Sequence, residues 1–448
     1  MIKGSKVLKK VLGIALTVAL AATASFSIPA TSAQAVTSAG NIAKGIDVSK
    51  YQGSINWSAV AASGVRFAFI KVGSTYSGMD PTFPYNMTQA QANGIKTGAY
   101  IYSYATNTEM AAMEAQLVIQ WLSAYQVSMP VVFDIEDACQ KNLSSAEINA
   151  IINTFCVLVD AAGYYPMVYS YKNFFNTKIG ATPWDKWVAQ FGDALDYPSC
   201  AFWQYSSKGS VSGINAKVDL NYQYKDYSKL IVKDGFVDHN GGKRFYTNYK
   251  MQTGWVNYQN ARYYFDPFGY MVKGWHVEGD GKMYYLSTDD GKASIGPTQI
   301  EGFTFYFNND GAMQYGFIDY GKGNRYFDPL ANGAMATTWF AYNGQMYYAD
   351  KDGNIAVGYR EVDKVPYFFE ENGALAINKQ VESNGKQFMA GADGVLTEIV
   401  PVEPGDIPSG KLDAETMAQM NGIDLSTLNE AQLKAFMDAV DAYNAMIP

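Results

Sequence analysis

The sequence predicts an α/β protein: a distorted TIM-like β/α barrel, then an all-β hairpin-repeat solenoid and a short helical tail. Two observations lead to this prediction. Between residues 43 and 228, short apolar runs alternate with longer helix-compatible segments, the pattern of a barrel of strands and helices. Between residues 235 and 396, a unit of about twenty residues recurs. A chain of 448 residues has room for two or three domains.

Residues 1–35 have the pattern of a secretory signal peptide. Four lysines form a basic start, Val11 to Ala22 is apolar, and Ala33-Gln34-Ala35 is a small-x-small cleavage site. The alternative, a membrane anchor, is disfavoured because a span needs roughly 20 apolar residues. We therefore expect a secreted protein, extracellular or associated with the cell wall, without stable membrane insertion.

Composition excludes several functional classes. The formal net charge is −8, and it becomes −12 without the four lysines of the signal segment, which has no acidic residue. A nucleic-acid partner is not expected, because such binding needs a basic patch. The two histidines, His239 and His276, lie outside residues 43–228. A Ser-His-Asp triad or a His-rich metal site is therefore absent from the first domain, and we expect no metal and no cofactor. One disulfide is possible, and the pairing stays open among Cys139, Cys156 and Cys200.

Eight apolar runs of the first domain are predicted as strands. They are Gly45–Ser49, Arg66–Val72, Thr97–Ser103, Val131–Asp134, Met167–Ser170, Trp187–Gln190, Ala201–Tyr205 and Val218–Asn221. The early connections contain helix candidates at Tyr85–Asn93, Thr108–Tyr125 and Ser145–Ala162. The later connections are too short for regular helices, so we expect the barrel to be distorted toward its end.

The fourth predicted strand ends in carboxylates at alternate positions, Asp134 and Glu136. In an extended chain, such residues share one face and lie about 6.5–7 Å apart. Two acids this close hold different proton affinities, because ionising one disfavours ionising the other. An acid and an anion at one glycosidic bond need this property. Taken alone, the pair favours the alternative, solvated acids that cap a loop, so the rest of the chain must decide.

Further acids and aromatic residues are predicted at the same edge of the barrel, where the strands have their carboxyl ends. Asp47 ends the first strand and Asp219 the last, and these two strands are neighbours once a barrel closes. Tyr104 and Tyr171 also stand at strand ends. The predicted catalytic residues are Asp47, Asp134, Glu136 and Asp219. The predicted substrate-binding residues are Tyr100, Tyr102, Tyr169, Trp203, Gln204 and Asn221, because stacking rings beside hydrogen-bonding groups suit a sugar.

The segment Gly45-Ile46-Asp47-Val48-Ser49-Lys50-Tyr51-Gln52-Gly53, with Ile55-Asn56-Trp57 after it, resembles the opening of the family 25 glycoside hydrolases. Other segments match in order: Phe67–Lys71, Gly98–Tyr100, Phe133–Glu136, Phe202–Tyr205 and Val218–Asn221. The members of family 25 are the Chalaropsis-type lysozymes, which are N-acetylmuramidases. The resemblance implies an eight-stranded barrel that cleaves the β-1,4 bond between N-acetylmuramic acid and N-acetylglucosamine in bacterial peptidoglycan.

The same resemblance implies a role for each acid. Glu136 would be the general acid, and Asp134 would keep it protonated and polarise the acetamido group of the substrate. Asp47 and Asp219 would complete the acidic floor. Attack by the acetamido oxygen and an inverting attack by water both remain open, as does a retaining mechanism.

The region 235–396 is predicted to form stacked hairpins, each too small to bury its own face. Aromatic pairs recur at Phe245-Tyr246, Tyr263-Tyr264, Tyr284-Tyr285, Phe305-Tyr306, Tyr326-Phe327, Tyr347-Tyr348 and Tyr367-Phe368. Glycine-aromatic steps recur at Gly235-Phe236, Gly254-Trp255, Gly274-Trp275, Gly316-Phe317 and Gly358-Tyr359, with Gly296-Pro297 and Thr338-Trp339 in the same place of two copies.

The units resemble choline-binding and glucan-binding repeats, which anchor proteins to cell walls. Choline-type repeats hold a quaternary ammonium by cation–π attraction. This sequence departs from them before the aromatic pair, where Trp is frequent in choline binders: here stand Arg262, Met283, Thr304, Arg325, Met346 and Pro366. The ligand is therefore left open between choline, a glycan and another teichoic acid. The predicted wall-ligand residues are Trp255, Tyr264, Trp275, Tyr285, Trp339 and Tyr348.

Residues 397–448 read as a linker and a small helical pair, Asp413–Met420 and Ser426–Met446, of unknown role. The whole sequence predicts a secreted peptidoglycan hydrolase that its repeats bring to the cell wall. One alternative is an adhesin whose barrel only binds glycan. A chitinase-like glycosidase is another, but Val132 stands where that family has a further Asp.

Overall fold

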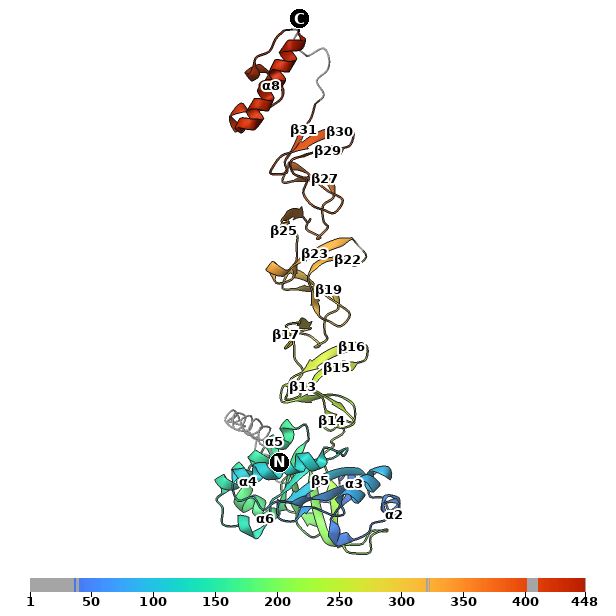
Figure 1. Cartoon of the computed structure of the whole chain (residues 1–448). Coiled ribbons are helices and arrows are strands. Elements are labelled where there is room, and N and C mark those ends of the chain that lie inside the picture. Colours follow the sequence, from blue (N-terminus) through green and yellow to red (C-terminus); the bar gives the residue numbers. More distant parts are fainter. Residues whose placement is uncertain (1–35, 38–39, 320, 322, 401–409, 448) are drawn as a thin grey trace, which may run out of the picture. The chain divides into compact units, whose positions relative to one another are not determined.

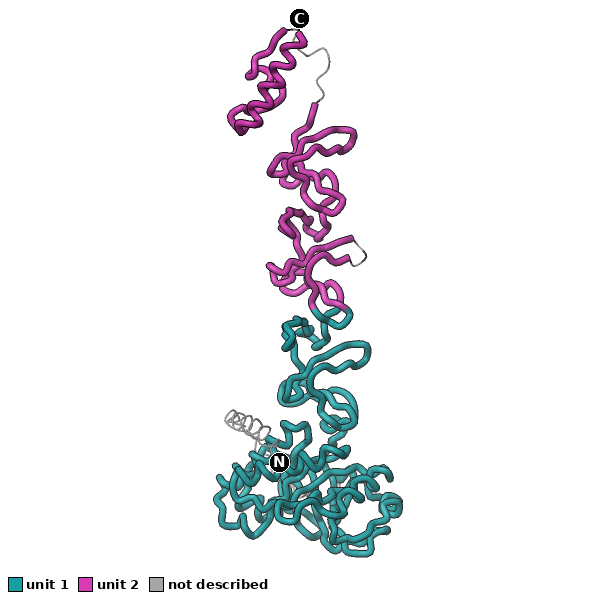
Figure 2. Tube along the Cα trace, viewed as in Figure 1, with its two compact units in different colours: residues 1–295, 309–312 teal, residues 296–308, 313–448 magenta. Residues whose placement is uncertain are grey.

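The computed structural model describes residues 36–37, 40–319, 321, 323–400 and 410–447 (Figure 1). The predicted signal segment, 1–35, and most of the predicted linker lie outside the described residues. Two compact units are distinguished (Figure 2). The first runs through Ile295 and takes in Asn309–Ala312; the second comprises Gly296–Asn308 and Met313–Pro448.

Eight strands close into the barrel, which confirms the predicted fold class. They are β2 (Ala43–Val48), β3 (Phe67–Ser74), β5 (Lys96–Tyr102), β6 (Val131–Asp134), β7 (Pro166–Tyr171), β8 (Asp185–Ala189), β10 (Phe202–Gly209) and β11 (Val218–Gln223). Their order is β2-β11-β10-β8-β7-β6-β5-β3, and pairing of β3 with β2 closes the ring. β11 runs antiparallel to both β10 and β2, whereas the other neighbours are parallel.

Helices cover the outside of the barrel where the connections are long. They are α2 (Trp57–Ala62), α3 (Phe83–Ala92), α4 (Thr108–Leu122) and α5 (Ser145–Ala161). The last three were predicted, and α2 was not. α5 begins with a capping box, in which Ser144 and Glu147 bond each other's backbone N–H. After β7 stand only the short turns α6 (Lys172–Phe174) and η3 (Phe175–Ile179), so the barrel is irregular toward its end, as predicted.

Alternation along the strands gives the barrel two cores. Phe67, Phe69 and Phe202 point inward and fill its interior with Met167. Residues of opposite parity, such as Ala68 and Phe133, face the helices instead. This packed interior leaves only the ends of the strands for a functional site.

Eight hairpins are present in the described part of the repeat region. Their strand pairs are β12–β13 (Gly235–His239, Gly242–Thr247), β15–β16 (Gly254–Tyr258, Ala261–Phe265), β17–β18 (Gly274–Val277, Met283–Leu286), β19–β20 (Gly296–Ile300, Phe303–Phe307), β22–β23 (Gly316–Asp319, Asn324–Asp328), β25–β26 (Trp339–Tyr342, Gln345–Tyr348), β27–β28 (Gly358–Val362, Val365–Phe369) and β29–β30 (Lys379–Ser383, Lys386–Ala390). The first seven hold the predicted aromatic pairs on their second strands, and the eighth lacks one.

The glycine of each step opens its hairpin because it adopts a backbone that other residues rarely take: Gly254 has φ +72°. Its cross-strand partner Phe265 is fully buried. The next residue, Trp255, stands opposite Tyr264 and is half-buried. The hairpin β15–β16 thus buries the ring of Phe265 and leaves the Trp255–Tyr264 pair more exposed.

The tail folds as two helices, α7 (Ala414–Met420) and α8 (Glu430–Met446). The second begins four residues later than predicted, because Asn429 caps it in a capping box with Gln432. Asn444 ties the pair together by bonding both backbone groups of Leu412 at 2.7 Å.

Three cysteines are free: Cys139, Cys156 and Cys200. Among the described residues, no helix is long and apolar enough to cross a membrane.

Candidate active site

Strand pairing brings Asp47 and Asp219 together. The two are register partners in the β2–β11 ladder. The sequence placed Asp219 at the end of the last strand; that was wrong, since it is the second residue of β11. Because β11 is antiparallel, its beginning lies at the same edge as the carboxyl end of β2. The side-by-side placement expected from barrel closure is therefore correct, for a different reason.

Asp134 is the last residue of β6, and Glu136 lies just beyond the strand. Hydrogen bonds hold the intervening Ile135: its N–H donates to the carbonyl of Tyr169 at 3.0 Å, and its carbonyl accepts from Ser170 Oγ at 2.7 Å. Glu136 therefore has a fixed position although it is outside the sheet.

The electrostatics separate Glu136 from an ordinary surface acid. Burial raises its pKa to about 7, and the Tyr171 hydroxyl opposes that rise by bonding the carboxylate. Burial, and then the charge of Glu136, hold the pKa of Asp134 well above its usual range. Each carboxyl group has a buried oxygen with no partner within the protein, Asp134 Oδ1 and Glu136 Oε2. Buried polar atoms are rarely left so, and a substrate would satisfy them.

A polar network fixes Asp47. Its Oδ2 accepts from Gln204 Nε2 at 3.0 Å and from Asn221 Nδ2 at 2.8 Å. Tyr169 Oη donates to the side-chain oxygen Oε1 of Gln204 at 2.9 Å, and Trp187 Nε1 donates to Oδ1 of Asn221 at 2.8 Å. Burial and the neighbouring Asp219 raise the pKa of Asp47 well above its usual range. Gln204, Asn221 and Tyr169, predicted as substrate-binding, thus have their polar groups directed to this network.

Two predicted tyrosines lie among the acids. Burial raises the pKa of Tyr100, and the charges of Asp47, Asp134 and Asp219 raise it further. Tyr102 Oη donates to Asp137 Oδ2 at 3.1 Å.

One residue of the barrel mouth, the end of the barrel where these acids lie, was not predicted from the sequence. Lys71 places its Nζ 4.8 Å from the centre of the Tyr102 ring. Burial lowers the pKa of Lys71, and Asp134 opposes this most strongly. The signal was available, because Lys71 has the same parity in β3 as the inward-facing Phe67 and Phe69.

Trp203 is not brought to the mouth. It is fully buried in the outer core, and its indole N–H donates to the Gln190 carbonyl at 2.7 Å. Trp203 and Gln204 are adjacent in β10, so they point to opposite faces of the sheet. Since Gln204 reaches Asp47 inside the barrel, Trp203 packs outside.

The predicted wall-ligand residues form three cross-strand pairs: Trp255 with Tyr264, Trp275 with Tyr285, and Trp339 with Tyr348. Their ring centroids are 5.1, 5.1 and 5.2 Å apart. A tyrosine of the following hairpin adds a third ring to the Trp255 pair and to the Trp339 pair, which makes each a three-sided cage. Tyr284 lies 4.7 Å from Trp255, and Tyr367 lies 5.0 Å from Trp339.

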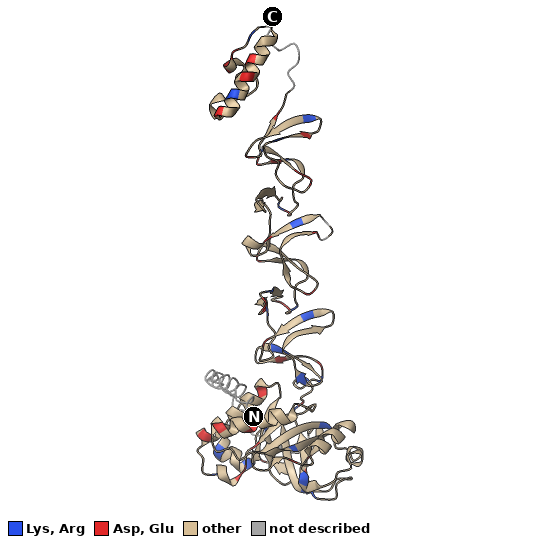
Figure 3. Ribbon diagram, in the orientation of Figure 1, with Lys and Arg blue, Asp and Glu red and all other residues tan. Residues whose placement is uncertain are grey.

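These two cages differ in charge. The guanidinium of Arg262 lies 4.0 Å from the centre of the Trp255 ring, and Trp255 Nε1 donates to Glu278 Oε1 at 2.6 Å. Met346 occupies the position in the hairpin of Trp339 that Arg262 occupies in the hairpin of Trp255. Most of the hairpin ribbon is tan in Figure 3, with few blue segments for Lys and Arg. The chain itself therefore supplies a cation to the Trp255 cage.

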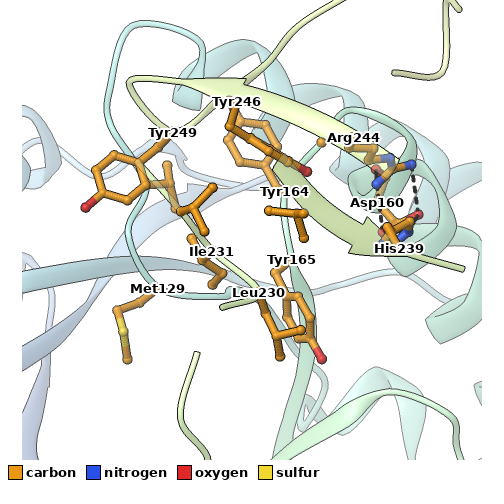
Figure 4. Close-up of a pocket in the computed structure, with 14 residues that line it drawn as sticks. Met129, Asp160, Tyr164, Tyr165, Leu230, Ile231, His239, Arg244, Tyr246 and Tyr249 are labelled. Atoms are coloured by element: carbon orange, nitrogen blue, oxygen red, sulfur yellow. Dashed lines mark hydrogen bonds and ion pairs between the residues drawn. The ribbon is translucent and has the colours of Figure 1, made fainter. Parts of the chain in front are cut away.

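The first hairpin is fastened to the barrel (Figure 4). Arg244 Nη1 of β13 donates to the backbone carbonyl of Asp160 in α5 at 3.0 Å and to its carboxylate at 3.3 Å. His239 Nε2 lies 3.1 Å from the same carboxylate. A cavity of about 20 Å³ beside these groups is lined by Tyr164 and Tyr246 among others. It has room for a single water molecule and is not a substrate site.

Comparison with known proteins agrees with this geometry. The family model described as glycosyl hydrolases family 25 matches residues 46–214, and the choline-binding repeat model matches residues 252–296. The uncharacterized protein YegX of Escherichia coli O6:H1 is 33% identical over 43% of this chain and 73% of its own length. Lysozyme M1 of Streptomyces globisporus is 34% identical, covering 40% of this chain and 66% of its own length. The N,O-diacetylmuramidase of Chalaropsis is 30% identical, covering 31% of this chain and 70% of its own length.

The barrel, its acidic mouth and these matches define a glycoside hydrolase of the lysozyme type, a peptidoglycan hydrolase. The chain belongs to family 25 of the glycosyl hydrolases, with choline-binding-type repeats that target the cell wall. Such an enzyme is extracellular or associated with the cell wall, and its repeats bind a wall polymer.

Proposed function

We propose that this enzyme cleaves the β-1,4 bond between N-acetylmuramic acid and N-acetylglucosamine, and that Glu136 donates the proton to the leaving oxygen. The observation that carries the proposal is the pKa of Glu136, raised to about 7 in a mouth shared with three other acids. A general acid works best when its pKa is near the working pH, since it then holds a proton and still releases it.

The other three acids have separate roles in this proposal. Asp134 orients the acetamido group of the substrate, while burial and the charge of Asp219 keep Glu136 protonated. Asp219, beside Asp47, stabilises the positive charge that develops on the sugar ring. The amides of Gln204 and Asn221 hold Asp47 next to Asp219, because both donate to Asp47 Oδ2. Tyr100 and Tyr102 contact the sugar.

Two reaction courses are compatible with these acids. In one, the acetamido oxygen attacks the anomeric carbon while Glu136 protonates the leaving oxygen, and water then opens the intermediate. In the other, water attacks directly and inverts the configuration. We favour the first, because Asp134 stands beside Glu136. Proton NMR of the first-formed anomer separates the two courses: an inverted product excludes acetamido attack, and a retained product excludes direct attack by water.

The cleaved bond is tested by the new reducing ends in a digest of purified peptidoglycan. Muramic-acid ends support the proposal, whereas glucosamine ends contradict it and indicate a chitinase-like specificity. A protein that binds the walls and releases no ends would be an adhesin.

We further propose a division of labour along the chain. Residues 1–35 direct export, residues 43–228 form the catalytic domain, and residues 235–396 hold a choline-bearing teichoic acid or a wall glycan. Residues 397–448 form a linker and a helical tail. Among the aromatic cages, that of Trp339, Tyr348 and Tyr367 is the better ligand site. The Trp255 cage already has the guanidinium of Arg262 over its ring, and a second cation there would be repelled.

The wall-binding role is tested by sedimentation with purified walls. Trp339→Ala should weaken retention about tenfold, since an aromatic cage contributes on the order of 1–2 kcal/mol. Trp255→Ala is the matched control and should change it less. Choline titrated into the full-length protein should quench its fluorescence saturably only if a quaternary ammonium is the ligand. Equal losses in the two variants would contradict the choice of cage.

A further inference from the structure

The segment that carries Glu136 is held from two sides by side chains beneath the mouth. On one side, β7 anchors Ile135, as described above. On the other side, the N–H of Asp137 donates to Gln140 Oε1 at 3.0 Å. Glu136 itself has no place in the ladder of β6, so its position depends on these two anchors.

Gln140 is fully buried, and both ends of its amide are used. Its Nε2 donates to the carbonyls of Ser103 and Ala105, each at 3.2 Å. These residues follow β5, so Gln140 ties the segment after β6 to the segment after β5. An amide with its donors and its acceptor engaged in this way has one orientation only.

The end of β5 is in turn held by Glu114 on α4, which is also fully buried. Its carboxylate accepts from Ser103 Oγ at 2.7 Å, from the N–H of Tyr104 at 2.9 Å and from Thr75 Oγ1 at 3.1 Å. A buried carboxylate is costly unless it is hydrogen-bonded, and here three donors compensate it. Thr75 follows β3 directly, so a single helix residue joins the ends of β3 and β5.

We propose that the buried chain Glu114–Ser103–Gln140 positions Glu136, which makes Glu114 and Gln140 positioning residues for proton donation. This inference rests on the proposed role of Glu136. Both side chains are without solvent access, so neither touches a substrate. Their effect passes through the backbone of Asp137, next to the proton donor. Displacement of a catalytic group by about 1 Å can cost on the order of a hundredfold in rate.

The test uses full-length Gln140→Ala and Glu114→Ala with purified peptidoglycan, normalised to folded protein by circular dichroism. We expect kcat to fall tenfold to a hundredfold with KM within about twofold, since the substrate contacts remain. We also expect the basic limb of the pH profile to move to lower pH, because a displaced Glu136 is more hydrated and loses its proton earlier. Glu114→Gln retains an acceptor oxygen and should restore most of kcat.

Glu147→Gln is the matched control. Glu147 is an exposed helix glutamate that also bonds a serine and a backbone N–H. Its loss should lower stability without moving the pH limb. An unmoved limb in Gln140→Ala and Glu114→Ala, or a rate loss that disappears on normalisation, would overturn the inference. Wild-type activity in Glu136→Gln would instead overturn the proposed function, so the two failures are distinguishable.

Discussion

Asp47 on β2 and Asp219 on β11 are partners across an antiparallel strand pair at the mouth of the barrel. The pKa of Asp47 is raised well above its usual range, first by burial and then by Asp219. The pKa of Asp219 is also raised by burial, while a hydrogen bond with Asp47 lowers it. We therefore expect Asp47 to be the member of the pair that holds the proton and Asp219 to be the anion.

Replacing Asp219 by Asn tests this assignment. The substitution removes a like charge, so the pKa of Asp47 should fall but stay above normal, because its burial is unchanged. The pKa is measured by NMR titration of the Asp47 carboxyl carbon. Activity on peptidoglycan should fall on the order of a hundredfold, since an electrostatic stabiliser is lost. Asp196→Asn, at an exposed acid paired with Lys172, is the control. An unchanged Asp47 titration would show that the two groups do not interact.

The pH dependence of kcat/KM should report Glu136. Activity should fall as the pH rises through about 7, where the proton donor ionises. Because the Tyr171 hydroxyl lowers the pKa of Glu136, Tyr171→Phe should move this limb to higher pH. The control is Tyr205→Phe, whose ring stacks on Tyr222 at 4.2 Å in the outer core. A limb that stays in place in Tyr171→Phe would contradict the assignment of the titration to Glu136.

The raised pKa of Glu136 also affects stability. Its pKa is about 7 in the folded protein and 4.5 ordinarily, so the folded state holds a proton that the unfolded chain releases. The stability of the folded state that goes with this protonated carboxyl is fully present below pH 4.5 and is lost as the pH rises through about 7. The loss amounts to about 3 kcal/mol. Glu136→Gln, which cannot ionise, should therefore unfold at a higher temperature than the wild type at pH 8 and at a similar one at pH 4. Identical melting curves at pH 8 would refute this.

Arg244 should be essential for attachment of the first hairpin. The Arg244 side chain is 2% exposed, and Asp160 opposite it is 17% exposed. Removing one partner of a buried ion pair costs about 3 kcal/mol, because the other charge stays behind uncompensated. Arg244→Ala should lower the free energy of unfolding by about that amount in urea titrations. Lys243→Ala removes the neighbouring exposed pair with Asp238 and should change it by about 0.5 kcal/mol or less. Equal effects of the two substitutions would contradict the account.

The eight strands could be predicted because each is an apolar run between turn residues, and the barrel order follows from sequential pairing. The direction of β11 was predictable too, although it was missed. Only Ser210 to Lys217 separate β10 from β11. A parallel neighbour needs a crossover of a dozen or more residues, so this connection indicates a hairpin.

The candidate site was predictable in its acids and less so in its neighbours. The four acids stand next to strand ends in the sequence, and strand ends meet in a barrel. Alternation within β10 would have separated Trp203 from Gln204. By contrast, Arg262 over Trp255 and Glu114 beneath the mouth depend on how distant segments pack. No local pattern in the sequence indicates such contacts.

The role of Glu136 as proton donor is tested most directly by the rate at which full-length Glu136→Gln releases reducing ends from purified peptidoglycan. The expected result is a rate at least a hundredfold below that of the wild type, since general-acid catalysis contributes about 10²–10⁴-fold. The variant should remain folded, with a melting temperature at neutral pH no lower than that of the wild type. A folded Glu136→Gln variant that digests peptidoglycan at the wild-type rate would contradict the account.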